Sequence, residues 1–249
     1  SGCPDLAELL LVDADESSFE GASYANCLFL DSGGEGRGAA ALPSMAIHRL
    51  MDGMESISDL LERAEVVILM AGLGGGMGSG ASGELAKMAK QFGSLVLSVV
   101  GLPFAEQPLR CAIAEEALPS LEAHSDVCIR VSMERLAWQS RRRKTNWMLG
   151  SGWIGELVEG LVTTLASVGR INLDLMDMRA IINKTGNATL IVGTGSSENP
   201  SSVVEMARNS PLNDVSIEGA KGCMIQVEGG PDMTLSHLTE LTDSFVSQM

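Results

Sequence analysis

The residues of this chain best placed to do chemistry form a glycine-rich run after an apolar segment. Between Ala71 and Ala81 the run holds six glycines among eleven residues. The apolar residues 66–70 before it predict a strand, and a helical pattern follows it over residues 81–92. Backbone N–H groups at a strand–helix junction can close on an anion, because the positive end of the helix dipole lies beneath them. We therefore predict that this run binds a phosphate.

Two familiar phosphate motifs fit the run poorly. A P-loop ends in Gly-Lys-Ser/Thr, whereas Gly80 is followed by Ala81. The Gly-x-Gly-x-x-Gly sequence from Gly78 to Gly83 begins late and has no obvious ribose-binding acid at the usual distance. A purely structural interpretation stays open, in which the glycines only let a helix pack closely on a strand.

Apolar strand-like runs alternate with helical patterns through the first half of the chain. Continuous apolar strands separated by amphipathic helices indicate a parallel sheet covered on both faces. We therefore predict a doubly wound α/β domain, whose ligands bind outside the carboxyl ends of the strands, where the glycine run falls. The expected strands are Leu9–Val12, Val66–Met70, Leu95–Val100 and Val127–Val131, and the expected helices are Ser44–Arg63, Ala81–Phe92 and Pro108–Ala123.

A wide apolar face marks a long central helix from about Gly152 to Ser167, which we expect to pack between two bodies. The pattern beyond it predicts a smaller, incomplete α+β unit. We expect three domains or segments, over residues 1–145, 146–168 and 169–249. In the last of these the expected helices are Asp174–Lys184, Ser201–Asn209 and Leu235–Val246, and the expected strands are Thr189–Val192 and Cys223–Val227.

Composition narrows the classes of function. The 249 residues are 45% hydrophobic and 20% charged, as in an ordinary globular protein. With 17 Lys and Arg against 32 Asp and Glu, the net charge of −15 repels nucleic acid and anionic membrane surfaces. We find neither a membrane-spanning stretch nor a signal peptide, so we expect a cytoplasmic protein. Five cysteines without a C-x-x-C pair and three scattered histidines predict no disulfide framework and no metal site.

The stretch from Gly74 to Gly80 resembles the Gly-Gly-Gly-Thr-Gly-Thr/Ser-Gly signature of the tubulin/FtsZ superfamily. Met77 replaces the first threonine, and the FtsZ-like cell-division GTPases of prokaryotes are the most similar branch. In that family the loop wraps the phosphates through backbone amides rather than a lysine. The resemblance implies GTP or GDP as the ligand, with Mg2+ as a candidate companion ion. The implied nucleotide-binding residues of this run are Gly74, Gly75, Gly76, Met77, Gly78, Ser79 and Gly80.

Other segments resemble the same family in the same order. The sequence from Gly36 to Pro43 resembles a loop near the terminal phosphate, which implies Gly36 and Gly38 as nucleotide contacts. Pro103-Phe104, with Glu106 and Arg110 after it, resembles a segment in which a glutamate meets the ribose and an arginine flanks the guanine. Trp147 falls where the family has a stacking phenylalanine, and residues 209–212 and 218–222 match motifs of the second domain.

The segment from Ile171 to Asp177 resembles the family's Asn-x-Asp-x-x-Asp/Glu loop. The residues alone also fit two acids that cap the start of a helix. In the family the carboxylates enter the nucleotide pocket of the next subunit and orient the attacking water. The resemblance therefore implies Asn172, Asp174 and Asp177 as catalytic residues that act between subunits.

Departures from the family pattern weaken part of the site. The family's first strand and first Gly-rich loop have no counterpart in this sequence. Met133 and Ser151 stand where the family has an asparagine and a guanine-reading aspartate. Because a buried acceptor for the guanine N–H groups is lost, we expect weaker selectivity for guanine.

The combined pattern predicts a GTP-binding protein of FtsZ type that assembles head to tail into filaments, with hydrolysis at the subunit junctions left open. Its partner would be a second copy or a complete FtsZ-like homologue, without nucleic acid and without membrane insertion. A first alternative is a non-catalytic module that modulates the filaments of a complete homologue. A weaker alternative, a dinucleotide-dependent oxidoreductase on a doubly wound sheet, leaves the matches of the second domain unexplained.

Overall fold

The structure is a computed structural model that describes residues 8–21, 26–30, 38–142, 162, 175–182, 195–196, 199–208, 218–225, 227, 229–230 and 232–247. Its centre is a parallel sheet of three strands in the order β3 (Val66–Gly72), β4 (Leu95–Leu102) and β5 (Val127–Ser132). Val66 is paired with Leu95, and Leu97 with Val127. The predicted parallel α/β fold is therefore confirmed.

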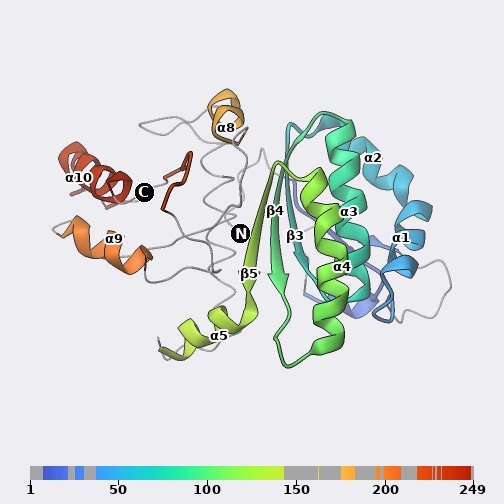
Figure 1. The fold of residues 1–249 in the computed structure, drawn as a ribbon. Coiled ribbons are helices and arrows are strands. Elements are labelled where there is room, and N and C mark those ends of the chain that lie inside the picture. Colours follow the sequence, from blue (N-terminus) through green and yellow to red (C-terminus); the bar gives the residue numbers. More distant parts are fainter. Residues whose placement is uncertain are drawn as a thin grey trace.

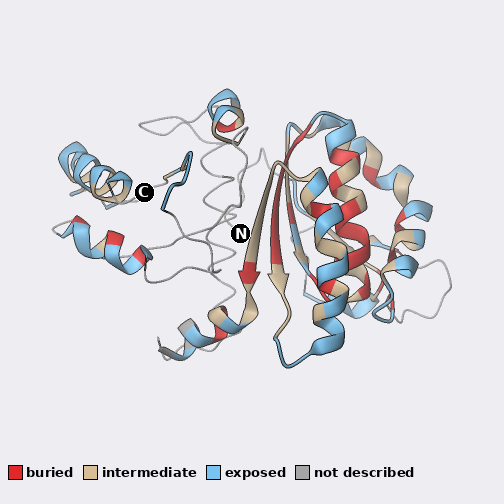
Figure 2. Ribbon diagram, in the orientation of Figure 1, coloured by how far each residue is buried: buried red, intermediate tan, exposed pale blue. Residues whose placement is uncertain are grey.

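Helices α3 (Gly76–Gln91) and α4 (Pro108–His124) lie side by side on one face of this sheet (Figure 1). Residues 95–100 of β4 are all buried, because β4 has a strand on each side and helices over it. The buried residues cluster on β4 and on the inner sides of α3 and α4 (Figure 2). The main core comprises Leu69, Leu73, Ala86, Ala89, Val96, Val100, Ala114 and Leu121.

Two further strands form a separate parallel pair. Strand β1 (Leu10–Asp13) pairs with β2 (Asn26–Phe29), and within the described part of the chain neither of them is hydrogen-bonded to the central sheet. This pair packs with α1 (Pro43–Asp52), α2 (Met54–Arg63) and α3 around a second core. Strand β2 was not predicted, because four residues with a polar Asn at their start give too short a pattern. Helix α3 therefore packs on both sheets, because its residues contribute to both cores.

Several predicted boundaries are wrong, each for a local reason. The helix expected over residues 44–63 is two helices, because Gly53 ends α1 and begins α2. The helix expected from Ala81 begins at Gly76, so half of the glycine run is helical. Helix α5 (Met133–Arg142), which directly follows β5, was not predicted. A short 3-10 helix over Glu16–Phe19 also lies after β1.

Three helices are described in the C-terminal part of the chain: α8 (Leu175–Ile182), α9 (Pro200–Arg208) and α10 (Leu235–Val246). Their positions agree with the three helices expected there. The strand expected over residues 223–227 is wrong for its described residues, which carry no strand pairing. The expected central helix over 152–167 lies outside the described residues apart from Val162, which is helical, and the strand over 189–192 lies wholly outside them.

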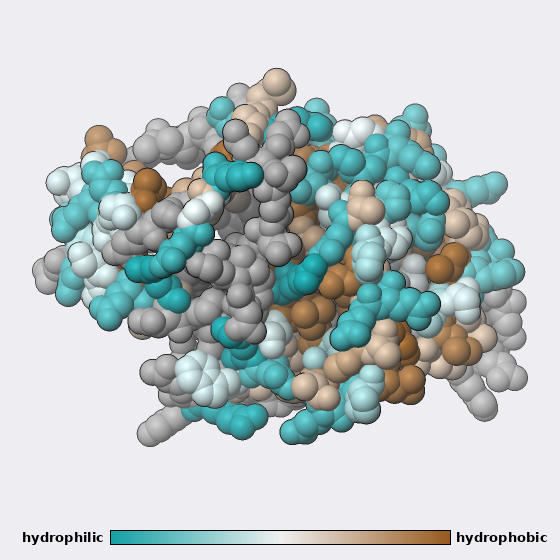
Figure 3. Space-filling model, viewed as in Figure 1, coloured by the Kyte–Doolittle hydropathy of each residue, from teal (hydrophilic) through white to brown (hydrophobic). Residues whose placement is uncertain are grey.

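The described surface is mixed in polarity. Figure 3 shows apolar side chains among hydrophilic ones over the region where β5 and α4 lie in Figure 1, and five of the six residues of β5 are only half-buried. No helix of the described ranges is long and apolar enough to cross a membrane.

Candidate functional site

The three strands of the central sheet end at one edge, which we call the carboxyl edge, and begin at the opposite amino edge. The glycine run follows β3 at the carboxyl edge, a loop over residues 103–107 follows β4, and α5 follows β5. Ligands of open parallel sheets bind at this edge. The predicted phosphate site therefore lies where such a fold places one.

Among the described residues, no side chain caps the backbone donors at the start of α3. Its N-cap is Gly75, which is extended with φ −110° and ψ 177° and provides no side-chain capping bond. The first amides of an α-helix have no partner within the helix, and the positive end of the dipole lies there. We call the N–H groups of residues 75–78 the amide cradle. Its chemistry suits an anion.

Packing explains three of the glycines. A Cβ atom on Gly76 would lie 2.6 Å from the Cβ of Ala39, and one on Gly78 would collide with the carbonyl oxygen of Gly72. A Cβ on Gly80 would collide with the carbonyl oxygen of Pro43. The structural interpretation of the run, close packing of a helix on a strand, thus holds for Gly78, which lies on β3, whereas Gly76 packs on the turn of Ala39 and Gly80 on the start of α1.

Gly75 differs from these glycines. A Cβ built on Gly75 would meet no atom of the described residues within 4 Å, so none of them fills the space in front of the amide cradle. Met77 turns its side chain away from that space, because it packs against the core formed by β1, β2 and the helices around them. Only the backbone of Met77 is therefore available to a ligand at this point.

Gly74 links the run to α4. It has a φ of +96°, and its N–H donates to the Oγ of Ser79 at 2.8 Å. A Cβ on Gly74 would lie 2.9 Å from the carbonyl oxygen of Arg110, so the loop rests on the first turn of α4. Ser79 is 6% exposed, and its buried hydroxyl accepts this hydrogen bond from the loop backbone. The sequence indicated Ser79 as a ligand contact and did not reveal this internal bond.

A second turn, over residues 38–41, lies against the start of α3 through Ala39. The Gly38 N–H donates to the carbonyl of Ala14 at 3.0 Å, and the Arg49 guanidinium donates to the carbonyl of Gly38 at 2.9 Å. Ala40 and Ala41 have φ values of 46° and 58°. Non-glycine residues in this region are strained, and such strain gathers at ligand sites. The strained pair was not apparent from the sequence.

The loop after β4 brings Glu106 and Arg110 to the carboxyl edge. Both residues are exposed, and Glu106 lies in a turn just before α4. The Ala105 N–H donates to the Oε1 of Glu134 at 2.9 Å, which ties this turn to the start of α5. The side chain of Met133 covers Gly101, since its Cε lies 3.1 Å from the position of a Cβ there. An apolar methyl group thus lies at this edge.

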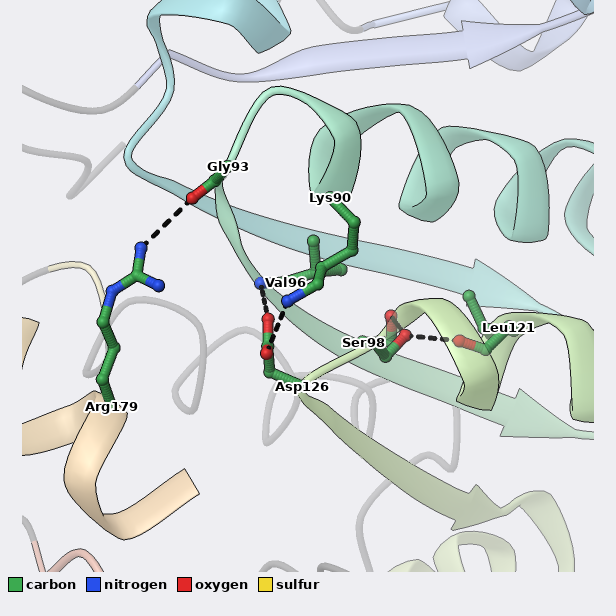
Figure 4. Close-up of polar contacts among 8 residues, drawn as sticks. Lys90, Gly93, Val96, Ser98, Leu121, Asp126 and Arg179 are labelled. Carbon is green, nitrogen blue, oxygen red and sulfur yellow. Dashed lines mark hydrogen bonds and ion pairs between the residues drawn. The ribbon is translucent and has the colours of Figure 1, made fainter. Parts of the chain in front are cut away.

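The remaining described candidate, Asp177, lies at the amino edge. Its helix α8 packs Met178, which is 3% exposed, on Leu95 and Leu97 near the start of β4. Asp177 itself is exposed. Figure 1 shows α8 beside the starts of the strands, away from α5, and Figure 4 shows Arg179 reaching Gly93 from α8. The structure therefore separates Asp177 from the amide cradle.

Comparison with known proteins agrees with this geometry. A family model described as Tubulin/FtsZ family, GTPase domain, matches residues 4–139, and a model described as FtsZ family, C-terminal domain, matches residues 186–249. The chain belongs to the Tubulin/FtsZ family. Among its relatives in this family is Cell division protein FtsZ 2 of Halobacterium salinarum, 32% identical over 252 residues. That match covers 98% of this chain and 61% of the relative, so the chain spans less than two thirds of the relative's length.

Solved structures of the Tubulin/FtsZ family have the same fold. A mutant FtsZ from M. jannaschii superposes with a TM-score of 0.85 at 29% identity, covering 98% of this chain and 75% of that one. An empty FtsZ dimer from M. jannaschii gives a TM-score of 0.85 at 30% identity, covering 97% of this chain and 72% of that one. The described part of this chain therefore has the fold of these FtsZ structures.

Four candidates from the Tubulin/FtsZ resemblance lie outside the described residues: Gly36, Trp147, Asn172 and Asp174. Their roles, and that of Ser151, stay predictions, as do the three domain boundaries. The structure brings together the others except Asp177. The members gathered at the carboxyl edge are Gly38, Gly74, Gly75, Gly76, Met77, Gly78, Ser79, Gly80, Glu106 and Arg110.

The thiol of Cys128 lies on β5, outside this site. Burial, followed by the negative charge of Glu122, raises the pKa of Cys128 from 9.0 to about 11. The thiolate is therefore scarce at neutral pH, and Cys128 does not offer a nucleophile.

Proposed function

We propose that this protein binds GTP or GDP at the amide cradle and assembles head to tail, so that Asp177 of one copy faces the nucleotide of the next. One observation carries the proposal: the cradle and Asp177 lie at opposite edges of one sheet. The seven residues of β3 separate these edges by roughly 20 Å. A carboxylate at one edge cannot reach a phosphate at the other within one subunit.

The carboxyl edge has the chemistry that a nucleotide requires. The amide cradle would meet phosphate oxygens, the open space at Gly75 leaves room for them, and the exposed Arg110 guanidinium adds a positive charge beside Gly74. No group of three metal-binding side chains occurs among the described residues. Mg2+ beside a nucleotide is bound by phosphate oxygens and water with at most one or two carboxylates, so the proposed site does not require such a group.

The proposed site should distinguish guanine from adenine less well than a site that has a polar contact to the base. Met133 presents a methyl group where a polar contact to guanine is expected, so preference for GTP over ATP should fall by about 1–3 kcal/mol relative to a site with that contact. Hydrolysis by Asp177, with Asn172 and Asp174 as proposed companions, would depend on position and electrostatics, as phosphoryl transfer generally does.

A heterologous contact between opposite edges does not close on itself and produces filaments. The dimer form of the M. jannaschii FtsZ structure supports self-association as the mode of assembly. The net charge of −15 opposes association of identical copies, so assembly should be favoured by salt that screens this repulsion. A role in prokaryotic cell division is part of the same proposal.

A variant at Gly75 tests nucleotide binding without disturbing the packing. Gly75→Val places methyl groups in the open space before the cradle, in an extended conformation that valine adopts readily. We expect at least a tenfold loss of affinity for GTP and GDP in calorimetric titration, of order 1.4 kcal/mol. Gly230→Val is the matched control, because a Cβ built on Gly230 also meets no described residue within 4 Å. Equal affinity in the two variants would refute the cradle.

Mixed variants test the sharing of the site between subunits. At GTP concentrations near the wild-type Kd, Gly75→Val and Asp177→Ala should each strongly lower GTP turnover, and their mixture should recover part of it. The recovery arises because one of the possible junctions joins an intact Asp177 to an intact cradle. Nucleotide binding by the wild type without turnover at any concentration would favour the alternative module that modulates a complete homologue. Membership of the Tubulin/FtsZ family leaves the oxidoreductase alternative without support.

A further inference from the structure

Helix α8 rests on the amino edge through two apolar side chains that lie one turn apart. Met178 packs with Leu95 and Leu97, and Ile182 joins the same cluster. Apolar contact is not directional, so the line of Met178 and Ile182, and the contact of Ile181 with Gly222 beside it, resist a roll of the helix only weakly. A directional contact beside the line is needed to fix its rotation.

Arg179 makes such a contact. Its Nη2 donates to the carbonyl oxygen of Gly93 at 3.2 Å, between residues 86 positions apart in the sequence. Gly93 follows α3 with a φ of +89°. The N–H groups of Gly93 and Ser94 donate hydrogen bonds to the carbonyl oxygens of Lys90 and Ala89, respectively, each at 3.0 Å. These bonds terminate α3. This glycine turn leaves the Gly93 carbonyl available to a donor from α8.

The surrounding charges favour this bond. Lys90, the other cation near the end of α3, is engaged by Asp126 at 2.7 Å. Figure 4 shows Lys90 turned toward Asp126 while Arg179 approaches Gly93 from α8. A cation at the C-terminal end of a helix is also attracted by the negative end of its dipole. The guanidinium of Arg179 thus meets both a hydrogen-bond acceptor and a favourable field.

The bond from Arg179 to Gly93 is linked to Asp177 because the two side chains lie on either side of Met178 in the sequence. Successive residues of a helix are about 100° apart, so Asp177 and Arg179 lie on opposite flanks of Met178. A roll of α8 that moves Asp177 must therefore pull Arg179 away from Gly93. We propose that Arg179 is a positioning residue, which fixes the rotation of α8 and hence the direction of Asp177 toward a second copy. This inference rests on the proposed function, because Asp177 needs a fixed direction only if it serves a neighbouring subunit.

Three variants of the full chain test the inference: Arg179→Ala, Arg179→Lys and the control Arg208→Ala. Arg208 is exposed and also lies in the last turn of its helix, α9. We expect the amides of residues 175–182 to exchange with deuterium about fivefold faster in Arg179→Ala, the factor that loss of one hydrogen bond predicts. Arg179→Lys, which keeps a donor, should restore most of the protection, and Arg208→Ala should match the wild type.

Turnover of GTP supplies a second readout, with kcat expressed per folded chain so that a loss of folded protein does not lower it. Arg179→Ala should lower kcat about tenfold and leave KM unchanged, because the amide cradle at the opposite edge is intact. Equal exchange of α8 in Arg179→Ala and Arg208→Ala would overturn the inference, as would faster exchange with an unchanged kcat. If the wild type hydrolyses no GTP, the proposed function fails by itself, and the exchange comparison alone decides whether Arg179 fixes α8.

Discussion

The two edges of the central sheet differ in how far side chains satisfy the backbone groups of the elements that meet there. At the carboxyl edge the backbone itself presents donors, and Gly75 leaves the start of α3 without a side-chain cap. At the amino edge, side chains bind the backbone. The Val96 N–H donates to Asp126 at 2.8 Å, and the Ser94 hydroxyl donates to the carbonyl of Ala64 at 2.7 Å.

This difference shows how one sheet can be open to a ligand at one end and closed at the other. Buried polar groups need partners, and those without one within the chain are free to take a ligand. The amino edge is internally satisfied by Asp126, Ser94 and Ser125, whose hydroxyl donates to the carbonyl of Leu121 at 2.7 Å. Blocking the open donors of the carboxyl edge should therefore affect binding, whereas removing an internal partner such as Asp126 at the amino edge should affect stability.

The largest effect should come from a glycine of the carboxyl edge that is needed for packing rather than binding. Gly78→Ala drives a methyl group into the Gly72 carbonyl oxygen, which is backbone and cannot move cheaply. We expect a loss of about 2–3 kcal/mol in the free energy of unfolding, measured with urea, despite the better helix propensity of alanine. Gly75→Ala, with open space at the same helix start, should cost less than about 1 kcal/mol. Equal costs at the two positions would erase the distinction between packing and binding glycines.

A smaller effect is expected at the amino edge from Asp126→Ala. The change leaves the Val96 N–H without its acceptor and removes the partner of Lys90. We expect a loss of about 1–2 kcal/mol in the free energy of unfolding with unchanged affinity for GTP. Lys90→Ala should cost less than about 1 kcal/mol, because it breaks only the exposed ion pair. A weaker affinity for GTP in Asp126→Ala would show that the two edges are coupled.

The smallest effect is a gain at the carboxyl edge. Ala41→Gly relieves a residue with a φ of 58°, a conformation that glycine adopts without strain. We expect the melting temperature to rise, by an amount equivalent to about 0.5–1 kcal/mol. Gly93→Ala is the converse control, since it places a side chain at a φ of +89° and should lower stability. A fall in melting temperature for Ala41→Gly would show that the turn over residues 38–41 is not strained.

The sequence predicted the elements whose patterns are long. Strands β3, β4 and β5 and helices α4 and α10 were identified within two residues at each end, because continuous apolar runs and amphipathic periods extend over many positions. The start of α3 was missed by five residues. Its glycines lower helix propensity, and only contacts with Gly72, Ala39 and Pro43 make them helical. Those contacts are remote in the sequence and leave no local pattern.

The candidate site was predictable to a similar extent. The glycine run, Glu106 and Arg110 could be placed at one edge because strand order and motif resemblance both point there. The bond from Gly74 to Ser79, the strain at Ala40 and Ala41 and the bond from Arg179 to Gly93 could not. Each depends on a backbone angle or on a contact between distant segments, which residue types alone do not determine.

The four glycines in the first half of α3, at positions 76, 78, 80 and 83, also bear on how the protein folds. Together they make this segment roughly 3–4 kcal/mol less favourable as a helix than the same segment with alanine. A sixteen-residue helix with that handicap does not persist in isolation, so α3 must form together with the strands on which it packs. During synthesis β4 emerges after α3. The nascent chain therefore has no ordered site for a nucleotide until residue 102 has left the ribosome, and binding is delayed until the domain condenses.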